Sequence, residues 1–351
     1  MIVSVILFFI IFGVLVTTHE LGHFLIAKAN NIRVLEFFIG MGPVLFKKQK
    51  GETLYSIRLL PIGGACRFEG EDDIDGEDHG YDERSFPNAN VWARIAVLFG
   101  GPFFNFITAM ILAVIVVANT SWSFPVISDF VEGESAAVEA GLKEGDMIVS
   151  VDGEPIHQTN EVIIISQFSQ GGVMHIGYKR DGQVYYTDLT PKYNEEEGRY
   201  YMGLRLGKYE RITGIKVIPY AFYEVLYHFK TTYRSLALLI KGKLSLGDVS
   251  GPVGMVKIVD DTYEAVSPYG LSSVVLTMLE LMVLLSVNLG VMNLLPFPAL
   301  DGGRLVFQFI EVLRGKPVPR EKEGMVHLVG MVVLMAFMLI VVVSDISKFM
   351  K

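Results

Sequence analysis

Two histidines and a glutamate near the amino terminus form the pattern H-E-x-x-H, as His19, Glu20 and His23. Residues four apart lie one above the other on a helix face, so both imidazoles can bind one metal ion. Zinc bound in this way makes a water molecule acidic, and the adjacent carboxylate can accept the proton of that water. The pattern therefore predicts a hydrolytic zinc site on a helix, with His19 and His23 as ligands and Glu20 as the general base.

A hydrolytic zinc site usually has three protein ligands, so a third ligand must come from another part of the chain. The best candidate is Asp301, which follows Pro296 and Pro298 and precedes Gly302 and Gly303. The prolines would end a preceding helix, and the glycines would allow the chain to turn sharply behind the carboxylate. The alternative is that Asp301 is only a polar residue at the end of a membrane segment.

Apolar residues are concentrated in four uncharged runs. With their flanks, these runs reach the roughly 20 residues that a bilayer-spanning helix needs. The first run could instead be a cleaved signal peptide, but no basic segment precedes it and no small-residue cleavage site follows it. The fourth run carries no chemical motif, so we expect it to serve in packing. The predicted spans cover residues 1–30, 91–120, 272–303 and 324–346.

Two further segments have the composition of ordinary chain outside a membrane. Residues 124–207 are rich in valine, isoleucine, tyrosine and glycine, and contain Asp152–Gly153 and Asp181–Gly182, which are typical of tight turns between strands. A small β-rich domain is therefore predicted there. Residues 215–271 begin with apolar residues near helical spacing among charged ones, which predicts an amphipathic juxtamembrane segment that lies on the membrane surface.

The segment of residues 31–90 predicts a β-hairpin with its turn at Lys50–Gly51, followed by an acidic loop that begins at Glu69. This loop could bind a metal ion, but its spacing is not that of a calcium-binding loop, and a solvated loop is the favoured interpretation. The chain has 30 Lys and Arg against 38 Asp and Glu, a net charge of −8, which excludes a basic surface for nucleic acid. Cys66 is the only cysteine, so an internal disulfide is excluded.

The order of the spans brings the two parts of the expected zinc site together. Two spans separate the H-E-x-x-H pattern from Asp301, so both parts lie at the same membrane face. The loops at this face, before the second span and after the third, are rich in lysine and arginine, which makes the face cytoplasmic. The β-rich domain would then be extracytoplasmic, and Cys66 would lie on the reducing side.

Four motifs together resemble those of bacterial site-2 proteases of the RseP/RasP type, which are intramembrane zinc metalloproteases. They are HELGH in the first span, GGPFFNF at Gly100–Phe106, SGPVGM at Ser250–Met255 and NLLPFPALDGG at Asn293–Gly303. The resemblance covers nearly the whole chain and implies a polytopic α-helical membrane protein with four transmembrane helices.

The resemblance also implies the roles of the site residues. His19, His23 and Asp301 would bind Zn²⁺, and Glu20 would be the catalytic base. Asn293 would bind the substrate or stabilise the oxyanion, an interaction that is typically worth about 3–4 kcal/mol.

For the segments outside the spans, the resemblance implies an inserted PDZ domain at residues 124–207 and a membrane-associated β-hairpin within residues 31–90. The PDZ match lies in the stretch Ala136–Asp146. A single such domain suggests the one-domain subgroup of the family, in which the domain either binds peptides or excludes bulky substrates, and we favour exclusion slightly. A substrate helix is expected to unwind and add to the β-hairpin as a strand.

The function that the resemblance implies is an endopeptidase that cleaves transmembrane segments of already trimmed membrane proteins, such as anti-sigma factors or remnant signal peptides. Its partners would be these substrates and the lipid bilayer of a bacterial inner membrane. One alternative is a catalytically idle membrane protein that binds partners through its PDZ domain, which the intact Glu20 disfavours. A metal transporter would need polar residues along several spans, and the second span offers little beyond Asn105 and Thr108.

Overall fold

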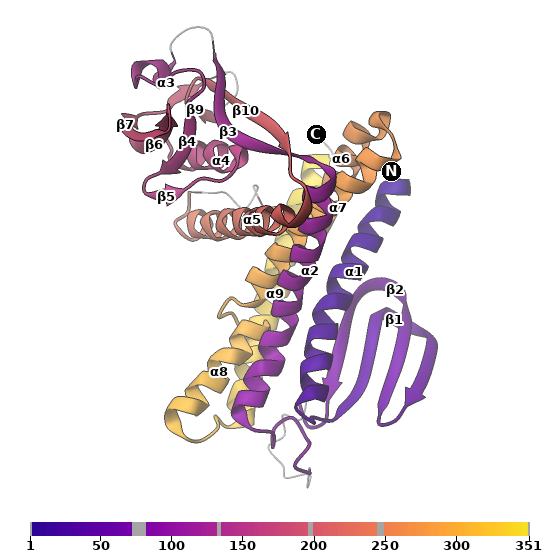
Figure 1. Cartoon of the computed structure of the whole chain (residues 1–351). Coiled ribbons are helices and arrows are strands. Elements are labelled where there is room, and N and C mark those ends of the chain that lie inside the picture. Colours follow the sequence, from indigo (N-terminus) through magenta and orange to yellow (C-terminus); the bar gives the residue numbers. More distant parts are fainter. Residues whose placement is uncertain (1, 72–81, 132–134, 196–198, 244–248, 350–351) are drawn as a thin grey trace. The chain divides into compact units, whose positions relative to one another are not determined.

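The computed structural model describes residues 2–71, 82–131, 135–195, 199–243 and 249–349 (Figure 1). Most of the acidic loop, in which we considered a metal site, falls at residues 72–81 and lies outside the described residues. The chain divides into two compact units, which are described separately. One unit contains residues 1–113 and 228–351, and the other contains residues 114–227.

Four helices in the described part of the chain are long and apolar enough to cross a membrane, which confirms the predicted number of spans. The third ends at Asn293 rather than at residue 303, because Pro296 and Pro298 have no backbone N–H to continue a helix. A separate amphipathic helix, α8 (Asp301–Arg314), follows and begins at the candidate ligand. The four long helices are α1 (Ile2–Ala29), α2 (Val91–Asn119), α7 (Leu271–Asn293) and α9 (Arg320–Phe349).

Helices α1 and α2 cross at glycines, where their backbones touch. A Cβ atom added at Gly22 would lie 2.3 Å from the carbonyl oxygen of Gly100, and one added at Gly100 would lie 2.9 Å from that of Gly22. No side chain fits at either position without moving a helix. Ala27 and Val97 near the crossing are completely buried. The H-E-x-x-H turn of α1 therefore lies directly against the middle of α2.

The predicted hairpin consists of β1 (Val34–Lys50) and β2 (Thr53–Phe68), with its turn at Gly51–Glu52. Both strands fold back on themselves. Gly40 and Gly42 in β1, and Gly63 in β2, have φ values between 78° and 90°, which only glycine adopts readily.

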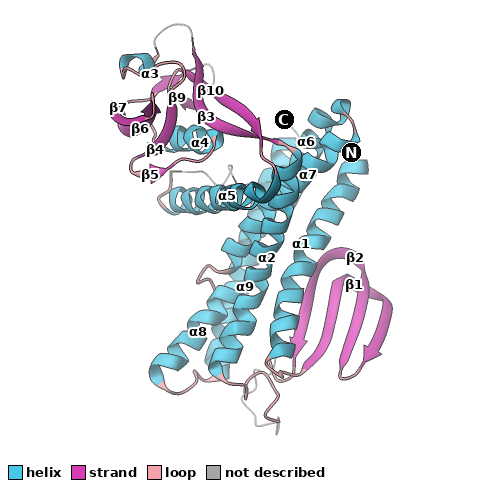
Figure 2. Ribbon diagram, viewed as in Figure 1, coloured by secondary structure: helices cyan, strands magenta, loops and turns pink. Residues whose placement is uncertain are grey.

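Because of this folding back, one residue can pair with two others. Phe37 of β1 pairs with both Tyr55 and Cys66, and the result is a small sheet beside α1 (Figure 2). The rings of Phe37 and Tyr55 pack against Phe24 of α1, with centroids 5.2 and 5.9 Å away. These aromatic contacts fix the sheet to the helix that carries the H-E-x-x-H pattern.

The second unit contains the small β-rich domain that the sequence predicts, and its core contains the buried residues Ile148, Val162 and Ile176. Its main sheet has the order β10-β3-β4-β6-β7, with β5 paired to β4. The turns Asp152–Gly153 and Asp181–Gly182 have positive φ at both residues, as expected for two-residue hairpin turns. The elements are β3 (Ser121–Phe130), α3 (Ala136–Glu139), β4 (Met147–Val151), β5 (Glu154–Pro155), α4 (Thr159–Phe168), β6 (Met174–Arg180), β7 (Gln183–Leu189), β8 (Lys192–Asn194), β9 (Arg199–Tyr201) and β10 (Leu204–Arg211).

The predicted amphipathic segment contains two helices, α5 (Val217–Ile240) and α6 (Pro252–Val266), with short 3₁₀ turns at Gly214–Lys216 and Ser267–Tyr269. Neither helix is among the four candidate spans. Their position on the membrane surface stays a prediction. Helix α6 is attached to the end of α9, because buried Asp345 accepts hydrogen bonds from the backbone N–H groups of Gly251 and Gly254.

Candidate metal centre

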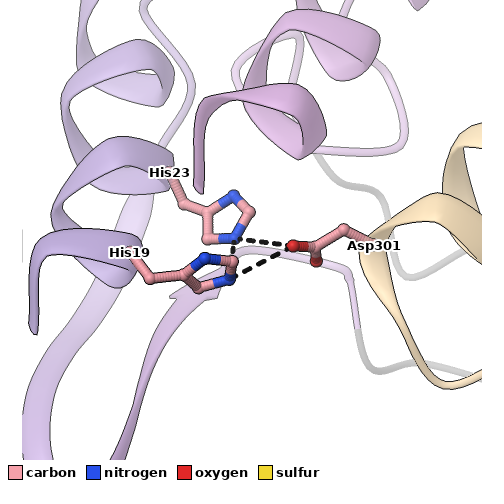
Figure 3. A group of neighbouring side chains, drawn as sticks. All are labelled: His19, His23 and Asp301. Carbon is pink, nitrogen blue, oxygen red and sulfur yellow. Dashed lines mark hydrogen bonds and ion pairs between the residues drawn. The ribbon is translucent and has the colours of Figure 1, made fainter. Parts of the chain in front are cut away.

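The three predicted ligands come together from two distant parts of the sequence. His19 and His23 project from one face of α1, and Asp301 projects toward them from the first turn of α8 (Figure 3). Both histidines are less than 10% exposed, and Asp301 is partly buried. This cluster is the only group of three or more potential metal ligands among the described residues.

The distances between the ligand atoms fit a tetrahedral zinc ion. Asp301 Oδ2 lies 3.2 Å from His19 Nε2 and 3.4 Å from His23 Nε2, and the two Nε2 atoms lie 3.2 Å apart. With zinc–ligand bonds of about 2.0–2.2 Å, two corners of a tetrahedron lie about 3.3–3.6 Å apart. The three atoms are therefore spaced as neighbouring ligands of one ion.

The hydrogen bonds of the imidazoles show which nitrogen faces the centre. His23 Nδ1 lies 2.8 Å from the carbonyl oxygen of Val97 in α2. A carbonyl can only accept, so Nδ1 carries the hydrogen and donates it, which leaves the lone pair of Nε2 directed at the centre. A metal-binding histidine is oriented in this way by a partner at its other nitrogen.

His19 has its corresponding partner in Asn105 of α2. The side-chain amide of Asn105 is completely buried, and its nitrogen stands 3.0 Å from His19 Nδ1. In this orientation Asn105 Oδ1 has no hydrogen-bond partner in the described structure. Flipping the side-chain amide exchanges its oxygen and nitrogen and brings Asn105 Oδ1 beside His19 Nδ1. There Oδ1 accepts the ring hydrogen, which leaves His19 Nε2 free to bind the ion. The donor set thus fits zinc, because three lone pairs converge with no hydrogen between them.

Helix α2 also provides the space for the two rings. A Cβ atom added at Gly101 would lie 2.3 Å from His23 Nε2 and 2.8 Å from His19 Cε1, so any larger residue would occupy the centre. Pro102 follows and has no N–H for the carbonyl of Leu98, which removes one hydrogen bond from this turn of the helix. The GGPFFNF motif therefore shapes one wall of the metal centre.

The third candidate ligand is carried by a compact coil, and the helix that follows it is held by an ion pair. A Cβ atom at Gly302 would lie 2.2 Å from the carbonyl oxygen of Leu295, so the chain passes close to itself just after the carboxylate. At its far end, α8 is held to α2 by Arg94, whose Nη2 lies 2.5 Å from Glu311 Oε1. Asp301 lies in the first turn of α8, where the helix dipole favours a negative charge.

The structure places Glu20 at the centre as well. It follows His19 on α1 and interacts electrostatically with His19, His23 and Asp301. A Cβ atom at Gly64 of β2 would lie 3.3 Å from Glu20 Cγ, so the sheet touches the candidate base through a residue without a side chain.

Asn293 is not part of the cluster. It ends α7, and its amide donates to the carbonyl oxygen of Leu289 at 3.1 Å. Two contributors were missed by sequence reasoning. The Val97 carbonyl belongs to the backbone and has no sequence signature, whereas Asn105 could have been found as an isolated amide in an apolar run, where a buried polar group is costly.

Comparison with known proteins identifies the family of this chain. Residues 7–337 match peptidase family M50. A protein of Clostridium acetobutylicum with the provisional name zinc metalloprotease is 34% identical over 343 residues, which cover 98% of this chain and 97% of that one. The regulator of sigma-W protease RasP of Bacillus subtilis is 31% identical over an alignment of 425 residues, which covers 98% of each chain.

A second RasP, the zinc metalloprotease of that name from Bacillus licheniformis, is 32% identical, with 98% of this chain and 99% of that chain covered. Among solved structures, the PDZ domain of an SdrC-like protein from Listeria monocytogenes matches 24% of this chain and 86% of its own, with 21% identity and a TM-score of 0.21. The residues that match the family extend from α1 into α9 and include the three candidate ligands. The chain therefore belongs to peptidase family M50, the site-2 type of membrane metalloprotease.

Proposed function

We propose that this protein is an intramembrane zinc endopeptidase that cleaves the transmembrane segments of membrane proteins already trimmed outside the membrane. The observation that carries the proposal is the tetrahedral spacing of His19, His23 and Asp301 at the end of an apolar span. Ionisable groups at such a position are costly and are usually retained for function.

Zinc bound by these residues would supply a Lewis acid that acidifies water and polarises a peptide carbonyl. The chain's own residues supply the rest. Glu20 would accept a proton from water at the centre and pass it to the leaving amine. Asn293 is assigned to substrate binding or to the oxyanion, for which its amide must first release the carbonyl of Leu289.

The segment of β2 that touches Glu20 suggests how a substrate is presented. A peptide bond in a helix is shielded by its own hydrogen bonds, whereas an extended segment can pair with the edge of a sheet. Gly64 lies on β2 beside Glu20, so a substrate strand added there would run close to the base. This supports cleavage of a locally unwound transmembrane segment.

The relatives and the charge pattern support the proposed substrate class and orientation. The name of the Bacillus subtilis relative describes a regulator of sigma-W, which supports anti-sigma factors as substrates here, with remnant signal peptides as a second class. The lysines and arginines between α1 and α2 and after α7 support a cytoplasmic position of the metal centre in the inner membrane. The PDZ domain would then be extracytoplasmic and would exclude substrates with large external domains.

The test compares wild type with Glu20→Gln on a reporter transmembrane substrate that lacks its external domain. The variant should bind as much zinc as wild type but cleave at least about a hundredfold more slowly, because it lacks the proton acceptor. The matched control is Glu144→Gln, which replaces an exposed carboxylate of the second unit. It should cleave the substrate at the wild-type rate.

Equal cleavage by wild type and Glu20→Gln would contradict the protease assignment. Zinc binding and substrate association without cleavage by either protein would favour the idle PDZ-bearing binding protein instead. A separate measurement of bound zinc tests the ligand set. Asp301→Ala should lower the zinc content, whereas an unchanged zinc content would show that Asp301 is not a ligand.

A further inference from the structure

The coil that carries Asp301 is held from α9 by a histidine. His327 Nδ1 lies 3.0 Å from the backbone nitrogen of Ala299, two residues before the ligand. A backbone N–H can only donate, so Nδ1 accepts this hydrogen bond and the ring hydrogen is on Nε2. The fourth span, to which the sequence assigned only packing, is thereby joined to the segment that delivers the third ligand.

Ala299 needs such a contact because its backbone is strained. Its φ is +76°, in the left-handed region that residues with a side chain rarely adopt. Leu300 is extended, and α8 begins at Asp301. A return of Ala299 to negative φ would redirect the chain just before the carboxylate, and Asp301 Oδ2 would leave its place 3.2–3.4 Å from the imidazole nitrogens.

The surroundings of His327 direct its ring at the coil. A Cβ atom at Gly330, three residues along α9, would lie 2.3 Å from Pro298 Cβ, so the helix lies directly against the coil. The ring of Phe307 in α8 stands 5.4 Å from the imidazole. Glu323 Oε1 lies 3.9 Å from His327 Nε2, where a carboxylate favours the tautomer with its hydrogen on Nε2.

We propose that His327 is a positioning residue of the metal centre, whose Nδ1 holds Ala299 in the left-handed conformation that places the Asp301 carboxylate beside the two histidines. This deepens the proposed function and rests on Asp301 as a zinc ligand. His327 contacts neither the ion nor the substrate in this role, and acts only through the coil.

The test measures how fast zinc passes from the full-length protein in detergent to an excess of chelator. His327→Leu removes the acceptor, so zinc should be lost about tenfold faster than from wild type, a typical effect of losing an outer partner of a ligand. His327→Gln has no acceptor at the Nδ1 position but stays polar and of similar length. It should also release zinc faster than wild type, and it replaces the leucine variant in the test if that variant does not fold.

Two rescues separate positioning from general packing. His327→Asn keeps an acceptor close to the position of Nδ1, so it should restore slow release. Ala299→Gly, combined with His327→Leu, should partly restore the slow release of zinc, because glycine adopts positive φ without a steric penalty. Ser347→Leu removes a different side-chain hydrogen bond at the opposite end of α9 and should release zinc at the wild-type rate.

Three outcomes can be distinguished. Wild-type release by both His327→Leu and His327→Gln, while Asp301→Ala loses zinc, overturns this inference but not the zinc site. If His327→Leu releases zinc fast and neither His327→Asn nor the added Ala299→Gly slows the release, His327 has only a packing role and the inference is overturned too. Retention of zinc by Asp301→Ala instead contradicts the proposed site on which the inference rests.

Discussion

At the scale of single residues, the candidate metal centre depends on the nitrogen that each imidazole presents. The Val97 carbonyl orients His23 and the Asn105 amide orients His19, so both partners come from α2. Neither contact changes the identity of a ligand. Together they decide whether two lone pairs are available at the same point, which the H-E-x-x-H pattern by itself does not guarantee.

The role of Asn105 leads to a first prediction. Asn105→Leu should lower zinc affinity about tenfold, because the Nδ1 hydrogen of His19 would lose its acceptor. Asn105→Asp keeps an acceptor there and should bind zinc more tightly than the leucine variant. Affinity is measured by competition with a zinc-binding chromophore.

The matched control is Thr108→Val, which removes a hydroxyl bonded to the Phe104 carbonyl on the same helix. It should leave the zinc affinity unchanged. If Asn105→Leu binds zinc as tightly as this control, Asn105 does not orient the ligand.

At the scale of elements, one carboxylate joins the start of α6 to the end of α9. Asp345 is 2% exposed and accepts from Gly251 N at 2.9 Å and Gly254 N at 2.7 Å. These N–H groups belong to the first turn of α6, where a helix lacks internal acceptors and its dipole favours a negative charge. A Cβ atom at Gly254 would lie 3.0 Å from Asp345 Oδ1, so this glycine of the SGPVGM motif allows the carboxylate to approach the start of α6 closely.

The prediction at this scale concerns stability. Asp345→Ala should lower the free energy of unfolding by about 2 kcal/mol, because two backbone donors lose a charged acceptor. The measurement is denaturant unfolding of the full chain in detergent. The control is Asp188→Ala, which removes an exposed carboxylate beside His175. It should change the free energy of unfolding by a few tenths of a kcal/mol at most. Equal stabilities of the two variants would show that the contact contributes little.

At the scale of the whole molecule, the sequence predicts features that repeat along the chain or lie within one motif. The four spans follow from uninterrupted apolar runs, and the hairpin turns of the β-rich unit follow from Asp-Gly pairs. His19, His23 and Asp301, which the structure brings together, could be selected from the sequence because their neighbours have recognisable spacing. The folding back of β1 and β2 at Gly40 and Gly63 was missed, because it depends on which distant segments pair.

The contacts to Val97, Ala299 and His327 were missed for a related reason. Two of the three partners are backbone atoms, which are the same in every residue and leave no trace in the sequence. The left-handed conformation of Ala299 also contradicts local preference, and it is stable only within the packed coil.

A last prediction concerns the acid stability of the membrane unit. Glu52, in the turn between β1 and β2, receives hydrogen bonds from Arg84 and Lys28, each at 2.7 Å, and so joins three segments of the chain. These two cations lower the pKa of Glu52 from 4.5 to about 2. The depressed pKa means that its stabilising contribution is complete above about pH 4.5 and is lost as the pH falls toward 2.

Glu52→Gln should therefore destabilise the protein at pH 6 and reduce the loss of stability between pH 4.5 and 2. The measurement is the free energy of unfolding of both proteins across this range. Glu144→Gln is again the control. Parallel pH profiles for wild type and Glu52→Gln would show that Glu52 does not contribute to acid sensitivity.

The glycine crossing of α1 and α2 also affects how the protein responds to its bilayer. Most neighbouring spans meet through side chains, which can change rotamer when a thicker or thinner membrane tilts the helices. At Gly22 and Gly100 the contact is backbone on backbone, with no rotamer to adjust. We therefore expect the two helices to tilt together as one body, so that hydrophobic mismatch is taken up elsewhere and His23 keeps its distance from the Val97 carbonyl in membranes of different thickness.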